Sequence, residues 1–447
     1  MQRAQMFKRA LGGDETVPWW DEIVLTAFDE RQAERFRAAL AAVPLPPRGR
    51  LRVVADPAGS ERIGNGGSTL AVLRLLEEEK ETRGTGERAA RRVLLMHCGG
   101  FSKRLPTQSI DGKAFAKTPF LLDGRAATML ELKLVSLAHL PASMPAGVFV
   151  TCSDDIVLLA DERVPFAPTG FTALGHPGSV RLGTSHGVFA PASSDMDDGI
   201  QPRRVADFLH KRSEEDIRAA YGLAADDEES RIWTDSAFFI SAPAATALLA
   251  AKDPPQGEID CYADFLCAVA STSRPYARWP ALAEALGAHR LHVVQDAASA
   301  FYHCGTMPEL LEQYCDDACF RARLGVDEKQ PRAVLIASHA ADDATFDGAA
   351  VVTDSSVGSA ARIGDRCVLA NVAVPDGAHV PPGTCLIGLA VGPDAHALAR
   401  FDVDEDVKDI FHTRSFAVCA SPAAAWRATM DSADDGAART TLHQLLV

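Results

Sequence analysis

Short apolar runs alternate with amphipathic stretches through roughly the first third of the chain. The runs that predict buried strands lie at residues 23–26, 51–55, 93–97 and 147–152. Between them, residues 29–43 and 68–79 carry apolar positions at the spacing that is typical of helices. Strands that alternate with helices predict an α/β sheet that is mixed but mostly parallel and is covered on both faces.

The same mixture continues, with more polar positions, between residues 160 and 325. Residues 232–241 and 291–294 predict further strands, and the acidic stretch 213–229 predicts a surface helix and loop.

A different period begins after about residue 330. Aliphatic residues recur every six positions and, after a slip of one residue, every six positions again, at Val351, Val357, Ile363, Leu369, Val374, Val380 and Leu386. A six-residue apolar period with glycine is typical of a left-handed parallel β-helix. The alternative is a coincidence in a stretch rich in Ala and Val.

These patterns divide the chain into three expected parts. An α/β domain covers residues 1–325 and a short left-handed β-helix covers 326–400. A tail over 401–447 packs on the β-helix and has a short helix at 440–446.

The charge of the chain excludes some classes of partner. Lys and Arg number 45 against 60 Asp and Glu, so the net charge is −15 and nothing favours binding to nucleic acid.

No apolar run is long enough to span a membrane, and the amino-terminal residues do not resemble a secretory signal. The ten cysteines form no CxxC pair, so we expect reduced thiols in a cytoplasmic protein. A zinc site through Cys315 and Cys319 is a weaker alternative.

The richest segment for chemistry follows the third predicted strand, at residues 93–115. Gly99 and Gly100 let the backbone approach a phosphate closely, and successive N–H groups can bind an anion. Arg104 can hold a phosphate with two hydrogen bonds, and Lys113 adds a further positive charge. The spacing differs from that of a Walker A loop. The plain alternative is a glycine-rich turn with basic residues facing solvent.

The segment GGFSKRLPTQSIDGK, residues 99–113, resembles the GGxxxRLxPxT…K signature of sugar nucleotidyltransferases. It is more similar to the GGxSxRLPxxSxxGKxF form found in the fucose-1-phosphate guanylyltransferase family. Further segments of the chain resemble that family in the same order, among them WWDEIVLTAFDERQ, GNGGSTLAVLRLLEE, TDSAFFIS, GEIDCYADFL and FYHCGTMPELL. The resemblance covers roughly residues 17–320.

The resemblance implies a GT-A-like, Rossmann-like nucleotidyltransferase domain and a reaction. A sugar-1-phosphate and a nucleoside triphosphate would give a nucleotide sugar and pyrophosphate, with L-fucose-1-phosphate and GTP as the expected pair. The sugar phosphate is already an anion, so the reaction needs alignment and charge neutralisation instead of a general base.

The resemblance also assigns roles to residues. Arg104 and Lys113 are the expected catalytic residues, and Mg²⁺ is the expected cofactor. Asp154 and Asp155, which follow a predicted strand, are its expected ligands, and a capping role is the alternative. The residues expected to bind the nucleotide are Gly99, Gly100 and Ser102 for the phosphates and Asn65, Gly66, Gly67 and Thr69 for the base and ribose.

One position departs from the pattern of bacterial hexose-1-phosphate nucleotidyltransferases. His303 stands where those enzymes often have a metal-binding Asp. We therefore expect the second metal ligand to come from elsewhere, with Asp235 as one candidate. A structural role for His303 is the alternative. Candidates for binding the sugar are His176, His186, Asp235, Ser236, Glu258, Asp260 and Tyr262. We expect Glu258 and Tyr262 to share one helical face, four residues apart.

Several alternatives stay open from sequence. D-arabinose-1-phosphate or another sugar phosphate, and ATP or UTP, would fit the same motif, because a missing methyl group discriminates weakly. A regulatory paralogue that binds nucleotide sugars is a second class, and a β-helix acyltransferase is a third. Homo-oligomers and a fused or separate sugar kinase are open partners, and the chain is either complete or part of a bifunctional enzyme.

Overall fold

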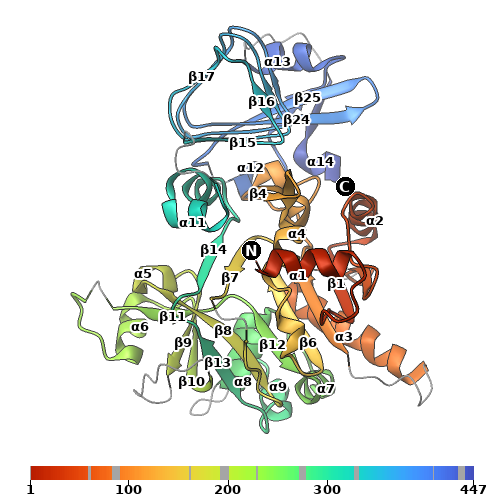
Figure 1. Cartoon of the computed structure of the whole chain (residues 1–447), viewed down its shortest axis with the longest axis vertical. Helices are drawn as coiled ribbons and strands as arrows, with labels where there is room; N and C mark the ends of the chain where they lie inside the picture. Colours follow the sequence, from red (N-terminus) through yellow and green to blue (C-terminus); the bar gives the residue numbers. More distant parts are fainter. Residues whose placement is uncertain are drawn as a thin grey trace. The chain divides into compact units, whose positions relative to one another are not determined.

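The computed structural model describes residues 2–58, 62–82, 91–160, 163–191, 201–227, 230–270, 278–326, 332–405, 407–430 and 438–446. The chain divides into two compact units (Figure 1). The first unit contains residues 1–99, 133–153 and 157–301, and the second contains residues 100–132, 154–156 and 302–447.

A ten-stranded sheet is the centre of the first unit. Four neighbouring strands at one side of it are parallel, in the order β2 (Arg50–Ala55), β1 (Glu22–Ala27), β3 (Arg92–His97) and β6 (Gly147–Cys152). Every residue of β1 is buried, and successive residues of a strand face opposite sides, so both faces of the sheet are covered there. The four strands confirm the predicted runs, with bounds shifted by no more than one residue.

The other six strands pair mainly in antiparallel fashion. They are β12 (Phe238–Ser241), β8 (Phe171–Gly178), β13 (Leu291–Gln295), β10 (Pro202–His210), β9 (Gly187–Pro191) and β11 (Ile232–Thr234). Only β13 and β8 are parallel among these pairings, so the sheet is mixed, and the expectation of a mostly parallel sheet was wrong beyond β6. The stretch 232–241, predicted as strand throughout, forms two strands that both pair with β8.

The helices of the first unit lie around this sheet. They are α1 (Gln2–Leu11), α2 (Glu30–Leu40), α3 (Gly64–Thr82), α5 (Val180–Gly183), α6 (Glu214–Tyr221), α7 (Ala242–Ala250), α8 (Cys267–Ala270) and α9 (Pro280–Ala285), with a π-helix η4 (Cys261–Leu266) and a short 3₁₀ turn η3 (Leu140–Ala142). The helix α4 (Met129–Ser136) begins in the second unit and ends in the first.

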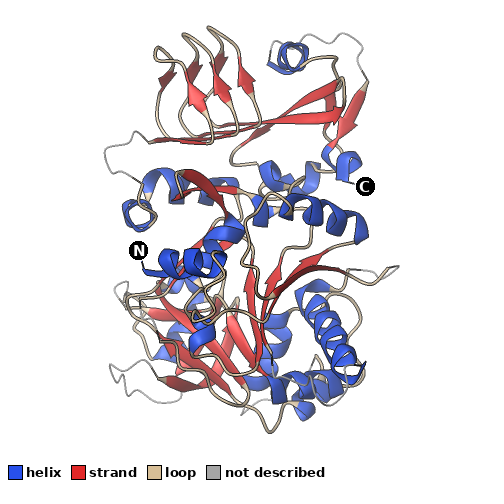
Figure 2. Cartoon of the chain, turned by 45° about the vertical axis from the view of Figure 1, so that its right-hand side comes forward, coloured by secondary structure: helices blue, strands red, loops and turns tan. Residues whose placement is uncertain are grey.

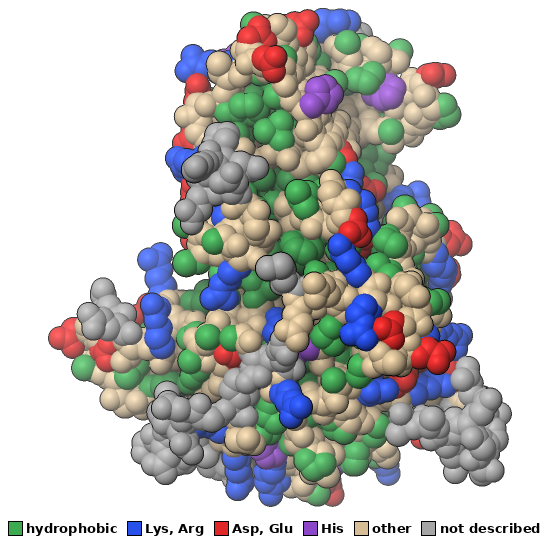
Figure 3. Space-filling view, viewed as in Figure 1, with side chains coloured by type: hydrophobic (Ala, Val, Ile, Leu, Met, Phe, Trp, Pro, Cys, Tyr) green, Lys and Arg blue, Asp and Glu red, His purple; other side chains and the backbone are tan. Residues whose placement is uncertain are grey.

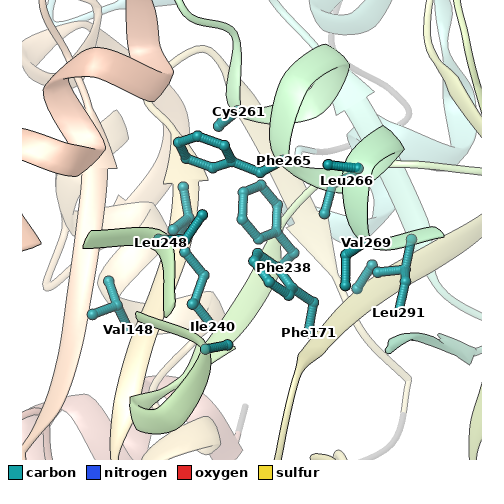
Figure 4. Close-up of a cluster of buried hydrophobic side chains, with 14 of the residues drawn as sticks. Val148, Phe171, Phe238, Ile240, Leu248, Cys261, Phe265, Leu266, Val269 and Leu291 are labelled. Atoms are coloured by element: carbon teal, nitrogen blue, oxygen red, sulfur yellow. The ribbon is translucent and has the colours of Figure 1, made fainter. Parts of the chain in front are cut away.

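The core of the first unit joins strands and helices that are distant in sequence. Phe171, Phe238 and Ile240 from the sheet pack with Leu248 of α7 and Phe265 of η4 (Figure 4). Each of these side chains is at most 1% exposed. Burial of a large apolar side chain stabilises a fold by about 1.5–3 kcal/mol, so this cluster holds the second half of the sheet against its helices.

The second unit contains three parallel ladders of short strands (Figure 2). The first ladder is β15 (Ala333–Ile336), β18 (Ala350–Thr353), β21 (Cys367–Ala370) and β24 (Thr384–Gly392), and the strand β25 (Ala395–Asp402) pairs antiparallel with β24. The other two are β16 (His339–Ala340), β19 (Ser356–Val357), β22 (Ala373–Val374) and β17 (Thr345–Phe346), β20 (Arg362–Ile363), β23 (His379–Val380).

The ladders explain the apolar period seen in the sequence. Val357 pairs with Val374, and Ile363 pairs with Val380, so each level of the ladders lies 17 residues after the one before. The buried cluster between the ladders contains Val352, whereas Val351 lies outside it, which corrects the first position of the predicted series. The shorter step of five residues therefore lies between Val352 and Val357 as well as between Leu369 and Val374.

The remaining elements of the second unit precede or follow the ladders. They are the turns η1 (Pro106–Gln108) and η2 (Lys113–Phe115), the hairpin β4 (Lys117–Leu122) and β5 (Arg125–Thr128), the helices α10 (Met307–Leu311) and α11 (Ala318–Arg323) with the π-helix η5 (Glu312–Asp316), and a tail with α12 (Val407–Ile410), β26 (Ser415–Ala417), α13 (Pro422–Met430), β27 (Arg439–Thr441) and α14 (Leu442–Leu446). The strands β7 (Asp155–Leu158) and β14 (Ala300–His303) form a two-stranded sheet through which the chain passes between units.

The tail contributes to the core of the ladders. Trp426 of α13 is 6% exposed and belongs to the same buried cluster as Val352. The helix predicted at residues 440–446 begins at Leu442, because Thr440 and Thr441 pair in a short strand first.

The surface carries both signs of charge. Lys and Arg side chains and Asp and Glu side chains are both present on the face seen in Figure 3. Among the described residues, every helix is too short or too polar to cross a membrane.

Candidate active site

The loop after β3 has an unusual backbone conformation. Gly100 has a φ of 109° and Ser102 has a φ of 49°, so two residues of the loop are in the left-handed region. A Cβ atom on Gly99 would lie 3.0 Å from the backbone N of Phe28, which favours glycine there. For Ser102, which has a side chain, the left-handed conformation costs about 1 kcal/mol or more. The surrounding structure therefore holds this loop in a strained shape.

Arg104 projects from the same loop. Its side chain is exposed, and it makes no hydrogen bond or ion pair with any residue that the structure describes. A guanidinium group in that state is available for an anionic ligand.

Lys113 lies at the start of η2 and contacts Asp154. Its Nζ donates a hydrogen bond of 2.7 Å to Asp154 Oδ2, and both side chains are less than one-fifth exposed. Asp154 follows β6, and Asp155 begins β7. Their carboxylate oxygens lie within 4.8 Å of each other. The structure thus brings together three of the predicted site residues.

His303 joins this cluster by pairing with two carboxylates. Its Nε2 lies 3.4 Å from Asp154 Oδ2, and its Nδ1 lies 2.9 Å from Glu309 Oε2. Burial alone would lower the pKa of His303, but hydrogen bonds to Asp154 and Glu309 raise it to about 9. Burial alone would raise the pKa of Asp154, but Lys113 and His303 hold it well below its usual range. Positive and negative side chains therefore alternate through the cluster, and Asp154 stays ionised.

Sequence reasoning missed Glu309, although a signal was present. Thr306 is the N-cap of α10 and Glu309 follows three residues later, the pattern of a capping box. Glu309 Oε2 also accepts a hydrogen bond of 3.1 Å from the backbone N of Gly305. The same carboxylate that caps the helix therefore fixes the ring of His303.

The donor atoms at Asp154 and Asp155 suit Mg²⁺. Carboxylate oxygens are the ligands that Mg²⁺ prefers, and two of them lie close together here. Both ring nitrogens of His303 face carboxylates, Asp154 on one side and Glu309 on the other, so the ring is placed to pair with the site's acidic side chains. The metal roles of Asp154 and Asp155 stay predictions that the geometry fits.

The glycine-rich segment at residues 64–69 is helical, although the apolar pattern predicted a helix only from residue 68. It forms the first turns of α3, which begins at Gly64 instead of residue 68. A Cβ on Gly66 would lie 2.6 Å from Ile259 Cγ2, and one on Gly67 would lie 2.7 Å from Ile63 Cβ. Close packing against these isoleucines is therefore a sufficient reason for glycine at both positions.

Asn65 and Thr69 have partners within the first unit. Asn65 Oδ1 accepts a hydrogen bond of 2.8 Å from the backbone N of Cys261, and Thr69 Oγ1 lies 2.9 Å from His97 Nε2. Burial lowers the pKa of His97 to about 4, so this histidine is neutral. The nucleotide role of these residues stays a prediction.

Two of the candidates for sugar binding form a buried cluster in the first unit. His176 is 1% exposed, and its two ring nitrogens lie 2.6 Å from Ser236 Oγ and 2.7 Å from Ser299 Oγ. Burial lowers the pKa of His176 to about 3. The rings of His176 and His186 both contact Phe301, at 5.8 and 5.4 Å between centroids.

Asp235 is nearly buried and accepts a hydrogen bond of 2.9 Å from the backbone N of Gly187. Burial raises its pKa to about 7, and the nearby charge of Asp260 acts in the same direction. A Cβ on Gly187 would lie 2.1 Å from Phe208 Cζ, so the approach to Asp235 depends on glycine.

The expected helical face of Glu258 and Tyr262 is wrong. Asp260 is the N-cap of η4, with its carboxylate accepting from the backbone N of Tyr262 at 2.8 Å, so Glu258 precedes the helix. Tyr262 donates a hydrogen bond of 2.6 Å to the carbonyl of Ser236, while Glu258 is exposed. The helix begins only after its acidic N-cap, so the helical spacing of four does not apply to Glu258 and Tyr262.

Comparisons with known proteins agree over most of the chain. The profile of the fucose pyrophosphorylase domain family matches residues 87–435. Fucose-1-phosphate guanylyltransferase of Mus musculus is 31% identical, with 90% of this chain and 78% of that protein covered. The Homo sapiens protein of the same name is 30% identical, with 89% and 74% covered. A bifunctional fucokinase/GDP-fucose pyrophosphorylase of Arabidopsis thaliana is 25% identical, with 68% of this chain and 32% of that protein covered.

At these identities and this coverage, the chain belongs to the fucose pyrophosphorylase domain family.

Proposed function

We propose that this protein is a fucose-1-phosphate guanylyltransferase, which converts L-fucose-1-phosphate and GTP into GDP-L-fucose and pyrophosphate. The observation that carries the proposal is the loop at residues 99–104. In a member of this family, that loop has two residues in the left-handed backbone region and presents an exposed Arg104 without a protein partner among the described residues. The names of the two relatives at 30–31% identity support the choice of substrates.

The reaction exchanges one phosphorus–oxygen bond for another. A phosphate oxygen of the sugar phosphate attacks the α-phosphorus of GTP, and the bond to the bridging oxygen of the pyrophosphate breaks. The nucleophile needs no deprotonation, so the residues of the site position the reactants and stabilise charge.

Two basic residues have separate roles in this proposal. Arg104 holds the β- and γ-phosphates, whose negative charge grows as pyrophosphate leaves. Lys113, already ordered by Asp154, contacts the α-phosphate or the incoming sugar phosphate. The backbone N–H groups of Gly99, Gly100 and Ser102 bind the phosphate oxygens.

Mg²⁺ fits this site as the cofactor. Asp154 and Asp155 would hold it through carboxylate oxygens. A bound Mg²⁺ supplies positive charge against the triphosphate. Lys113 and His303 keep Asp154 ionised, which is the state that a metal ligand requires.

The remaining predicted residues belong to the first unit. We propose that Asn65, Gly66, Gly67 and Thr69 contribute to binding the base and ribose, and that the sugar is bound near His186, Asp235 and Tyr262. His176 and Ser236, which hydrogen-bond each other, would shape that region from below the surface. The four neighbouring parallel strands, of which β3 leads into the glycine-rich loop, support a GT-A-like arrangement of this unit.

We further propose that the three ladders form a short left-handed parallel β-helix. Support comes from their parallel registers and the constant offset of 17 residues. We also propose a cytoplasmic location, because the ten cysteines are all free thiols. A sugar kinase would supply the substrate, and one relative carries such an activity in its name.

The test is identification of the product by mass spectrometry. The purified chain would be incubated with Mg²⁺, GTP and L-fucose-1-phosphate, and in parallel with ATP or UTP and with D-arabinose-1-phosphate or mannose-1-phosphate. Formation of GDP-fucose at the highest kcat/KM of the panel supports the proposal. A higher kcat/KM for another pair reassigns the substrate, and no nucleotide sugar from any pair contradicts the activity.

A further inference from the structure

The loop at residues 100–104 contacts residues of the carboxyl-terminal tail. The ring of Phe101 stacks on Phe411 with 6.2 Å between centroids and an interplanar angle of 20°. The same ring meets His443 edge-on at 6.3 Å. All these residues belong to the second unit, so the contacts lie within one compact body.

A second contact holds the loop two residues later. Lys103 Nζ lies 2.7 Å from His412 Nε2 and 5.3 Å from the centroid of the Phe411 ring. A lysine ammonium can only donate, so the imidazole nitrogen that it meets is the acceptor. The rings of His412 and His443 lie 4.3 Å apart, so the tail residues support one another.

The contacts divide the loop into two sets of residues. Phe101 and Lys103 contact the tail, whereas Arg104 is exposed and has no partner among the described residues. Ser102, between the two tail contacts, has the strained left-handed backbone. Anchors on both sides of a strained residue prevent the loop from relaxing to a more common conformation.

We propose that Phe411 and His412 are positioning residues that hold the loop in the shape that receives the triphosphate. The proposal rests on the proposed function of this loop, and it gives the tail a part in the reaction beyond packing on the ladders. Neither residue needs to touch a substrate, since each acts through Phe101 or Lys103.

Amide hydrogen exchange measures how firmly the tail holds the loop, and it does not depend on enzyme activity. In Phe411→Leu and His412→Ala, we expect the amides of residues 101–105 to exchange at least about fivefold faster than in the wild type. Phe416→Leu makes the same change in the same tail, where Phe416 packs on Phe401 instead, and should leave loop exchange within about twofold. His412 is exposed, so His412→Ala should fold normally even where Phe411→Leu does not.

Kinetics then separate positioning from a general loss of structure. His412→Ala should raise KM for GTP and lower kcat/KM about tenfold, with KM for the sugar phosphate little changed. His412→Gln keeps a hydrogen-bond acceptor and should recover most of the loss. In a Lys103→Ala background, the His412→Ala change should have almost no further effect, because the two residues act as a pair.

Faster exchange confined to the loop, with rescue by glutamine, would support the proposal. Loop exchange that is unchanged in His412→Ala, or equally fast in Phe416→Leu, would overturn it. A wild-type protein that forms no nucleotide sugar would contradict the proposed function alone, since the exchange measurement still decides whether the tail holds the loop.

Discussion

Lys113 and Asp154 are 41 positions apart in the chain, yet Lys113 Nζ and Asp154 Oδ2 are joined by an ion pair of 2.7 Å. The pair fixes the last basic residue of the glycine-rich motif against Asp154, within the second unit. His303 approaches the same carboxylate oxygen from another side. A lysine held in this way loses little freedom when a phosphate binds, which is what alignment of charged reactants requires.

Replacement of Lys113 should remove most of the turnover. We expect Lys113→Ala to lower kcat by about 10²-fold or more, because a positive charge near the α-phosphorus is lost. Lys117→Ala is the matched control, since Lys117 also pairs with an aspartate, Asp354, but lies on β4. Steady-state kinetics and a melting curve for each variant make the comparison, and equal kcat in the two variants would refute the role of Lys113.

Removal of divalent metal should stop the reaction. EDTA should abolish product formation and added Mg²⁺ should restore it, because Asp154 and Asp155 supply oxygen donors. Asp155→Asn should raise the Mg²⁺ concentration for half-maximal rate by about tenfold or more. Full activity in EDTA, or an unchanged Mg²⁺ requirement in the variant, would contradict this assignment.

Asp235 should make the stability of the protein depend on pH. Burial raises its pKa from 3.8 to about 7, so the folded state binds a proton more tightly than the unfolded state between these values. Stability from this group is therefore present below about pH 4 and is lost as pH rises toward 7, by about 1.4 kcal/mol for each pKa unit of difference. Asp260 increases the shift and Lys211 opposes it.

Thermal melting of wild type and Asp235→Asn from pH 5 to 8 checks this prediction. The asparagine variant should gain in melting temperature relative to the wild type as pH rises to about 7, with no further gain above it. Parallel pH profiles for the two proteins would show that Asp235 titrates normally.

Gly66 should be intolerant of a side chain for reasons of packing. A Cβ there would lie 2.9 Å from the carbonyl oxygen of Ile259, so we expect Gly66→Ala to destabilise the fold by about 1–3 kcal/mol. Gly12→Ala is the control, because its Cβ would meet only ordinary contacts at 3.5 Å or more. Chemical denaturation compares the two, and a Gly66→Ala protein as stable as the control would disprove the close packing.

Local patterns predicted the first half of the large sheet well. The run 147–152 matches β6 residue for residue, because a buried parallel strand is apolar at almost every position. In the antiparallel part, strands were predicted within 232–241 and at 291–294, but their pairing direction was not, since it depends on contacts between distant strands that no local period encodes. The first turns of α3 were missed because glycine disfavours helices, and packing against Ile259 overrides that preference.

The motif at residues 99–113 could be found from sequence, but its partners could not. The contacts of Phe101 and Lys103 with the tail span more than 300 positions, and His412 carries no local signal of its role. Glu309 could have been found from the capping box that it forms with Thr306.

The most direct test of the central claim is the initial rate of pyrophosphate release from GTP and L-fucose-1-phosphate by wild type and Arg104→Ala. We predict release that depends on both substrates in the wild type and a kcat lower by about 10²–10³-fold in the variant. The variant should melt at the wild-type temperature, because Arg104 is exposed and has no partner among the described residues. Equal rates in the two proteins, or no release by the wild type, would contradict the claim that this loop carries the reaction.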